Sequence, residues 1–214
     1  MKNFIGRNAE LKEKVNKHLQ KLTHTETDFY TALKQEDILE LKTVLSDINN
    51  LLTFKLTLAA GNWLSEFFSL NLKQKELVLD KIDRTKPNEQ GYDILIYEPI
   101  KLIAEVKCNS PVKEGAKFGA MQSKKLLEDA QKLLYGKKQL PNTDDFLKFL
   151  FVIDLGNRSH EAVVELVRMT KIRVENEERL NRNIIREHLI ILDDQIRIEH
   201  LEFDKIYIKV LKLE

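Results

Sequence analysis

The stretch GYDILIYEPIKLIAEVK, residues 91–107, constrains the fold more than any other part of this chain. Its apolar residues alternate with others, which predicts two strands, over 92–97 and 101–108, separated by a break at Pro99. In this hairpin, one face is apolar throughout and suited to a core; it carries Tyr92, Ile94, Ile96, Leu102, Ala104 and Val106.

The other face of the hairpin carries three charged residues, Asp93, Glu105 and Lys107, within strands too apolar to be ordinary surface. Burying such charges is costly unless they pair or hold a metal. Glu105 and Lys107 leave the same face of one strand because they are two residues apart. A connection of three or five residues would place Asp93 opposite Lys107 or Glu105, and the apolar pattern on both strands requires such an odd-numbered connection.

Composition indicates a globular chain with one large core, since 43% of the 214 residues are hydrophobic and 32% are charged. The formal net charge of +1 does not by itself indicate a nucleic-acid partner, but residues 101–138 hold nine lysines against four acidic residues. The single cysteine, Cys108, excludes an internal disulfide. No apolar run reaches the length of a membrane span, so we expect a soluble, cytoplasmic protein without a membrane partner.

The order of predicted elements indicates an α/β fold. We expect residues 1–55 to form a helical N-terminal extension packed on the core, and residues 56–214 to form one domain. The core of that domain is predicted as a helix over 56–72, strands over 76–84, 92–97 and 101–108, a helix over 120–135 and a strand over 146–155. A second long helix is expected from His160 to about Asn183, with later strands over 188–192, 195–202 and 205–213, the last two as a closing hairpin.

Two carboxylates and an ammonium group that converge in a half-buried place suit hydrolysis of a phosphodiester. Oxygen ligands with waters completing the shell are what Mg²⁺ prefers, and the Val106 carbonyl between the two charged side chains offers a further ligand. Lys107 is placed to hold the attacking water and to offset the charge that develops. The alternative is a structural ion pair among the same residues.

Asp93-x11-Glu105-Val106-Lys107 resembles the PD-(D/E)xK motif of the restriction-endonuclease-like nucleases, with Tyr92 standing where that motif has proline. The predicted order from 56 to 155 is similar to their αβββαβ core, a central mixed sheet flanked by helices. The resemblance implies that Asp93 and Glu105 bind metal and that Lys107 positions the nucleophile. It also implies a further metal-binding glutamate from the preceding helix, the place that Glu66 occupies.

Further residues are candidates for contact with DNA. Gln131 and Tyr135 have the Q-x3-Y spacing found in exonucleases of the same superfamily, and lie one helical turn apart. A set of lysines just beyond the motif could contact the phosphate backbone or form a solvated face; it comprises Lys113, Lys117, Lys124 and Lys125.

The expected function is that of a Mg²⁺-dependent DNA endonuclease, with Mn²⁺ able to substitute, most like a type II restriction enzyme that cuts duplex DNA as a homodimer. One alternative is a repair or recombination nuclease of the same superfamily, either an exonuclease or a junction resolvase. Another is a catalytically inert binding or assembly protein on a degenerate nuclease fold.

Overall fold

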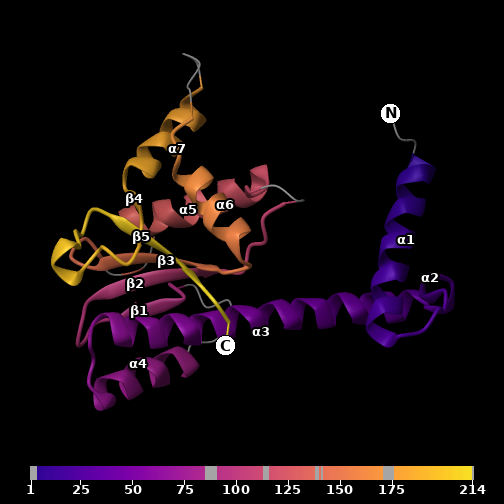
Figure 1. Ribbon diagram of the computed structural model, residues 1–214, viewed down its shortest axis with the longest axis horizontal. Coiled ribbons are helices and arrows are strands. Elements are labelled where there is room, and N and C mark those ends of the chain that lie inside the picture. Colours follow the sequence, from indigo (N-terminus) through magenta and orange to yellow (C-terminus); the bar gives the residue numbers. More distant parts are fainter. Residues whose placement is uncertain are drawn as a thin grey trace. The chain divides into compact units, whose positions relative to one another are not determined.

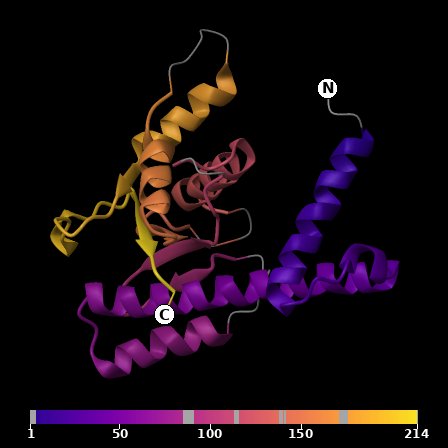
Figure 2. The same cartoon turned by 45° about the vertical axis from the view of Figure 1, so that its right-hand side comes forward.

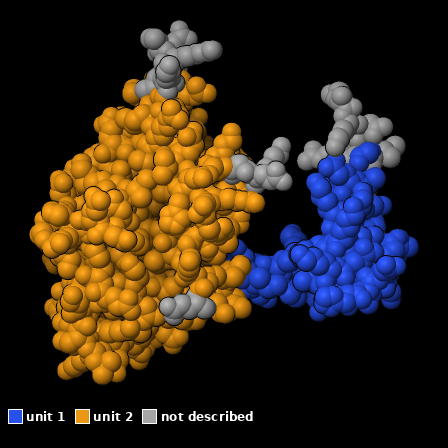
Figure 3. Space-filling view, viewed as in Figure 1, with its two compact units in different colours: residues 1–49 blue, residues 50–214 orange. Residues whose placement is uncertain are grey.

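The computed structural model forms two compact units, residues 1–49 and 50–214 (Figure 3). It describes residues 4–84, 91–112, 116–137, 140, 142–170 and 176–213. Within that part of the chain, no helix is long and apolar enough to cross a membrane.

The first unit is helical, as predicted. It contains α1 (Phe4–Thr23), α2 (Phe29–Ala32) and the first half of α3 (Gln35–Phe67). The short helix α2 begins where Asp28 accepts hydrogen bonds from the backbone and hydroxyl of Thr31, a cap that satisfies an otherwise unpaired N–H. The expected packing of this extension on the core stays a prediction.

The second unit is built on a mixed five-stranded sheet in the order β1-β2-β3-β5-β4, so the general α/β class is confirmed (Figure 1). The pair β1–β2 is antiparallel, and the pairs β2–β3, β3–β5 and β4–β5 are parallel. The strands are β1 (Ile94–Ile96), β2 (Leu102–Lys107), β3 (Leu147–Ile153), β4 (Leu189–Ile191) and β5 (Ile206–Leu211).

Helices cover both faces of the sheet (Figures 1 and 2). The second half of α3 and α4 (Leu72–Arg84) bury Leu56, Leu64 and Val78 against one face. The opposite face is covered by α5 (Ala120–Tyr135), α6 (Asn157–Val167) and α7 (Glu177–Glu187). All seven residues of the central strand β3 are buried, which confirms the interpretation of its continuous apolar run as a strand enclosed on both faces.

The strand predicted over 76–84 is wrong, because these residues belong to helix α4. Leu77 and Leu79 gave the segment an apparent alternation, but Leu77 is exposed, and the buried pair is Val78 and Ile82, one helical turn apart. Asn71 caps the helix by exchanging hydrogen bonds with Gln74. In the described chain, two strands therefore precede α5 where the αβββαβ order requires three.

Two later elements also differ from expectation. The single helix predicted over 160–183 is two helices, α6 and α7; α6 ends where Arg168 adopts an extended conformation, and Asn176 caps the start of α7. The expected closing hairpin is wrong, since β5 pairs in parallel with β3 and β4 and the segment before it contains a short 3₁₀ helix, Ile198–His200.

Candidate active site

The β1–β2 hairpin has the register that the apolar pattern requires. Ile96 pairs with Leu102 and Ile94 with Ala104, so a five-residue connection joins the strands. This register confirms the odd-numbered connection, but the paired residues end at Ile94, so Asp93 lies just beyond them. The prediction that Tyr92 shares the apolar face with Ile94 is wrong, because Tyr92 belongs to the hydrophobic cluster on the opposite face of the sheet.

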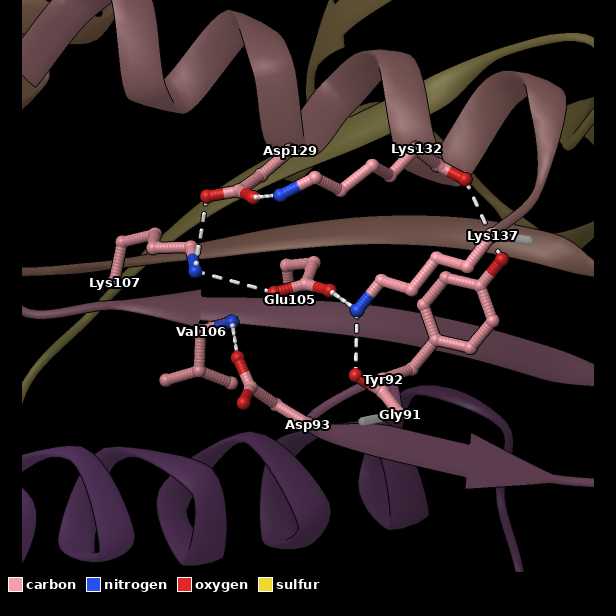
Figure 4. A network of polar contacts seen from close by, with 9 residues as sticks. All are labelled: Gly91, Tyr92, Asp93, Glu105, Val106, Lys107, Asp129, Lys132 and Lys137. Atoms are coloured by element: carbon pink, nitrogen blue, oxygen red, sulfur yellow. Dashed lines mark hydrogen bonds and ion pairs between the residues drawn. The ribbon is translucent and has the colours of Figure 1, made fainter. Parts of the chain in front are cut away.

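Asp93 lies just before β1, at the edge of β2 (Figure 4). Its Oδ2 accepts a hydrogen bond of 2.7 Å from the backbone N–H of Val106. Because β1 begins only at Ile94, this carboxylate takes the place of a strand partner for that N–H group. The local backbone thus fixes Asp93 beside the strand that carries the other two motif residues.

Glu105 is the most deeply buried charged residue of the hairpin, with 4% of its surface exposed. Its Oε2 lies 3.1 Å from Lys107 Nζ, so the two residues meet on one face of β2 as predicted. Its Oε1 lies 2.6 Å from Nζ of Lys137, which follows the end of α5. Two lysines therefore offset the charge of a carboxylate that would be costly to bury alone.

Helix α5 adds a third carboxylate to this group (Figure 4). Leu126, Ala130 and Leu133 anchor the helix in the core, and Asp129 projects from the flank beside them. Asp129 Oδ2 lies 3.0 Å from Lys107 Nζ, and its Oδ1 lies 2.7 Å from Nζ of Lys132. Lys107 is therefore held between Glu105 and Asp129, with its ammonium directed along the charged face of the hairpin.

The pKa values of Asp93 and Asp129 are shifted in opposite directions. Burial, together with the negative charge of Glu105 nearby, raises the pKa of Asp93 to about 6. Burial also acts to raise the pKa of Asp129, but Lys107 and Lys132 outweigh it and hold that pKa below its usual range. Burial acts to lower the pKa of Lys107, yet the surrounding carboxylates raise it overall. Lys107 is therefore fully charged at neutral pH.

Because the pKa of Asp93 is raised on folding, ionising this group costs stability as the pH rises from about 4 through about 6. We expect Asp93→Asn to remove this cost while its amide oxygen still accepts from Val106. In the absence of metal, its stability relative to wild type should increase by roughly 1–2 kcal/mol between pH 4.5 and pH 8. Urea unfolding in EDTA at both pH values measures this, and a difference that does not change with pH would contradict it.

The donor atoms here are carboxylate and carbonyl oxygens, the kind of ligand that a hard divalent cation prefers. Asp93 and Glu105 are near enough for the charge of Glu105 to raise the pKa of Asp93. The Val106 carbonyl lies between Glu105 and Lys107 in the sequence. Among the residues that the structure describes, no three His, Cys, Asp or Glu side chains form a group that could hold a metal. A metal here would therefore rely on two carboxylates, one carbonyl and water, a ligand set that suits Mg²⁺ better than metals that prefer nitrogen or sulfur.

Glu66 is not brought to this group. The part of α3 nearest the site is marked by Thr53, whose hydroxyl lies beside the thiol of Cys108, the residue after Lys107. This hydroxyl acts to lower the pKa of the thiol, although burial raises that pKa overall. This contact places the site end of α3 at Thr53, and Glu66 follows thirteen residues later, about 20 Å along a helix. Glu66 is exposed in the last turn of α3, on the side away from its buried neighbours Leu64 and Ser65.

The candidate DNA contacts fall on different sides of α5. Gln131 lines a shallow hollow between α5 and α7 with Lys124, which lies 3.3 Å from Glu178. Gln131 is two residues from Asp129, about 200° around the helix, so it lies on the flank away from the site. Tyr135, one turn further along, shares that flank and is exposed.

Lys125 is four residues before Asp129 and therefore lies on the flank of α5 that faces the site, where it is exposed. Lys117 is also exposed, in the connection between β2 and α5. Lys113 lies outside the described residues.

Asp129 and Lys137 were missed as site residues by the sequence analysis. Asp129 carries a weak signal, since it is an acid next to the buried stripe of a helix and three residues from Lys132. Lys137 carries none, because its contact with Glu105 spans 32 residues and depends on how the chain turns after Gly136. That glycine ends α5 with a φ of 80°, a conformation that L side chains rarely adopt.

Comparisons with known proteins add nothing to this geometry: no protein-family model matches the chain, and neither a curated protein nor a solved structure does.

Proposed function

We propose that this chain is a divalent-metal-dependent nuclease that hydrolyses phosphodiester bonds in DNA. The observation that carries the proposal is that Asp93, bonded to the Val106 N–H, lies near enough to the contacting pair Glu105 and Lys107 for both charges to act on its pKa. Buried ion-pair networks also occur for purely structural reasons, but this one combines a raised acid pKa with a fully charged lysine, a combination typical of functional sites.

Bound Mg²⁺ would neutralise phosphate oxygens and lower the pKa of a water. Asp93 and Glu105 would hold it, with the Val106 carbonyl. Lys107 would orient the attacking water and offset the charge that develops on the phosphate, because its ammonium is fixed beside Glu105. Asp129 would keep Lys107 in that orientation through its contact of 3.0 Å.

We propose that the sheet belongs to the restriction-endonuclease-like class. An antiparallel β1–β2 pair, a helix and a strand parallel to β2 support this assignment, although the strand expected before them is helix α4. An endonuclease fits better than an exonuclease, since Gln131 and Tyr135 lie on the flank of α5 away from the site. Of the lysines predicted to contact a phosphate backbone, Lys117 and Lys125 are exposed, and Lys125 lies on the flank of α5 that faces the site.

Substrate topology tests this function. Purified protein should cut closed circular DNA in the presence of Mg²⁺ or Mn²⁺ and leave it intact in EDTA. Gel electrophoresis of circular, linear and branched duplexes separates the nuclease classes, because an exonuclease requires ends and a resolvase requires branches. Absence of cleavage of every substrate with either metal would contradict the proposal.

We also propose that the enzyme acts as a homodimer through the first half of α3. None of the described side chains of residues 1–49 is buried, so this unit has no core of its own. Four apolar residues in the first half of α3 recur at intervals of three and four residues, the spacing of a coiled-coil seam. They are Ile38, Leu41, Leu45 and Ile48, of which Leu45 is 55% exposed.

Substituting Leu45 and Ile48 together by glutamate should convert a dimer into a monomer, because two charges would enter the seam of each helix. Light scattering coupled to size exclusion measures the mass. Leu39→Glu is the matched control, since Leu39 is equally exposed but lies one position off the seam. A wild-type monomer, or an unchanged mass in the double variant, would contradict the dimer.

A catalytically inert DNA-binding protein is the second candidate. The observation in its favour is that both oxygens of Glu105 already have lysine partners. Such a protein would bind DNA without metal, and substitutions of Asp93 would not alter its binding.

A further inference from the structure

Lys137 pairs with Oε1 of Glu105, whereas Lys107 pairs with the other oxygen, Oε2 (Figure 4). Its Nζ lies 2.6 Å from Oε1, a shorter contact than the 3.1 Å between Lys107 Nζ and Oε2. The pairing of Lys107 with Glu105 follows from their places on one strand. The pairing of Lys137 does not, because it brings a residue from beyond α5 back to the hairpin.

Two further contacts fix this ammonium. Lys137 Nζ donates a hydrogen bond to the carbonyl of Gly91, and it lies 4.6 Å from the centre of the Tyr92 ring. Its side chain is 20% exposed, so a path to solvent exists beside the network. Lys137 therefore occupies a defined position between the start of the hairpin and the middle of β2.

A divalent metal and this ammonium compete for one carboxylate. A metal bound to Oε1 at about 2.1 Å would lie only a few ångströms from Nζ. In a half-buried site, the repulsion between charges of +2 and +1 at that distance is poorly screened. The hydrogen bond also uses an oxygen that a metal needs as a ligand.

We propose that Lys137 is a displaceable cation of the metal site, whose ammonium occupies Glu105 in the metal-free protein and leaves as the metal binds. This inference rests on the proposed function, because it takes Asp93 and Glu105 as the metal ligands. It assigns Lys137 the role of setting metal affinity, so that the site loads only when the metal concentration is sufficient to displace it.

Calorimetric titration with Mg²⁺ tests this role without measuring cleavage. Lys137→Met and Lys137→Gln should each bind Mg²⁺ about tenfold more tightly than wild type, the gain expected when a charged hydrogen bond no longer has to be broken. Lys137→Arg, which keeps the charge, should bind like wild type. Circular dichroism establishes that each variant is folded.

Lys132→Met is the matched control, because it removes an equal charge whose ammonium pairs with Asp129 instead of Glu105. Its affinity should stay within about threefold of wild type, since only a general electrostatic effect remains. Unchanged or weaker binding by Lys137→Met and Lys137→Gln would overturn the inference, as would equally tight binding by Lys132→Met. Those results leave the proposed function intact if wild type binds Mg²⁺ and cuts DNA. A complete absence of Mg²⁺ binding and of cleavage would contradict both.

Discussion

Lys107→Ala is expected to reduce DNA cleavage by on the order of 10³-fold while the protein remains folded. The ammonium is held between Glu105 and Asp129, where it would act on the attacking water and on the developing charge. Lys137 and Lys132 still pair with these two carboxylates in the variant, so no buried charge is left alone. Single-turnover cleavage of plasmid DNA with saturating Mg²⁺ measures the rate.

A control variant on the neighbouring helix α5 distinguishes the loss of a catalytic group from the loss of a positive charge in general. Lys124→Ala removes an ammonium from α5 that pairs with Glu178 on the flank away from the site, and it should cut within about threefold of wild type. DNA binding in EDTA should be similar for both variants. Cleavage by Lys107→Ala at the rate of Lys124→Ala would remove Lys107 from the mechanism.

The largest effect on stability is expected at Lys148, which has no role in the proposed chemistry. This lysine of β3 is 1% exposed, and its Nζ donates hydrogen bonds to the carbonyls of Thr143, Phe146 and Phe203. Lys148→Ala leaves a cavity and three carbonyls without their donor, so we expect a loss of about 3 kcal/mol in the free energy of unfolding. Urea unfolding measures the loss.

Two variants identify the source of that loss. Lys148→Met retains most of the volume and should lose roughly half as much, because only the hydrogen bonds are missing. Lys101→Ala removes an exposed lysine near the same end of the sheet and should cost no more than about 1 kcal/mol. A loss for Lys148→Ala no larger than that for Lys101→Ala would show that the buried ammonium contributes nothing.

The parts of the fold that could be predicted are those in which the sequence fits only one secondary-structure pattern. The hairpin register followed from alternation on both strands, and β3 followed from a continuous apolar run. Residues 76–84 offered two patterns, since leucines at 77 and 79 alternate while Val78 and Ile82 are one helical turn apart. Burial against the sheet favoured the second pattern, and sequence alone does not show which residues will be covered.

The predictable part of the site is likewise the part that depends on local spacing along the chain. Glu105 and Lys107 meet because they share a strand, whereas Asp93 is held just beyond the paired residues by its hydrogen bond from the Val106 N–H. Asp129 and Lys137 enter through the packing of α5, which no short-range spacing encodes. Glu66 was predicted as a site residue only because it lies in the helix that precedes the hairpin. It belongs to the last turn of α3, which lies far along the helix from the site residues.

Titration of the protein with Mn²⁺, followed by electron paramagnetic resonance of the free ion, tests the central claim most directly. If Asp93 and Glu105 hold a divalent cation, wild type will remove Mn²⁺ from solution with a stoichiometry of at least one, and both Asp93→Ala and Glu105→Ala will bind it at least tenfold more weakly. If wild type leaves the free-ion signal unchanged, or if Asp93→Ala binds as tightly as wild type, the three residues form an ion-pair network and the nuclease assignment is wrong.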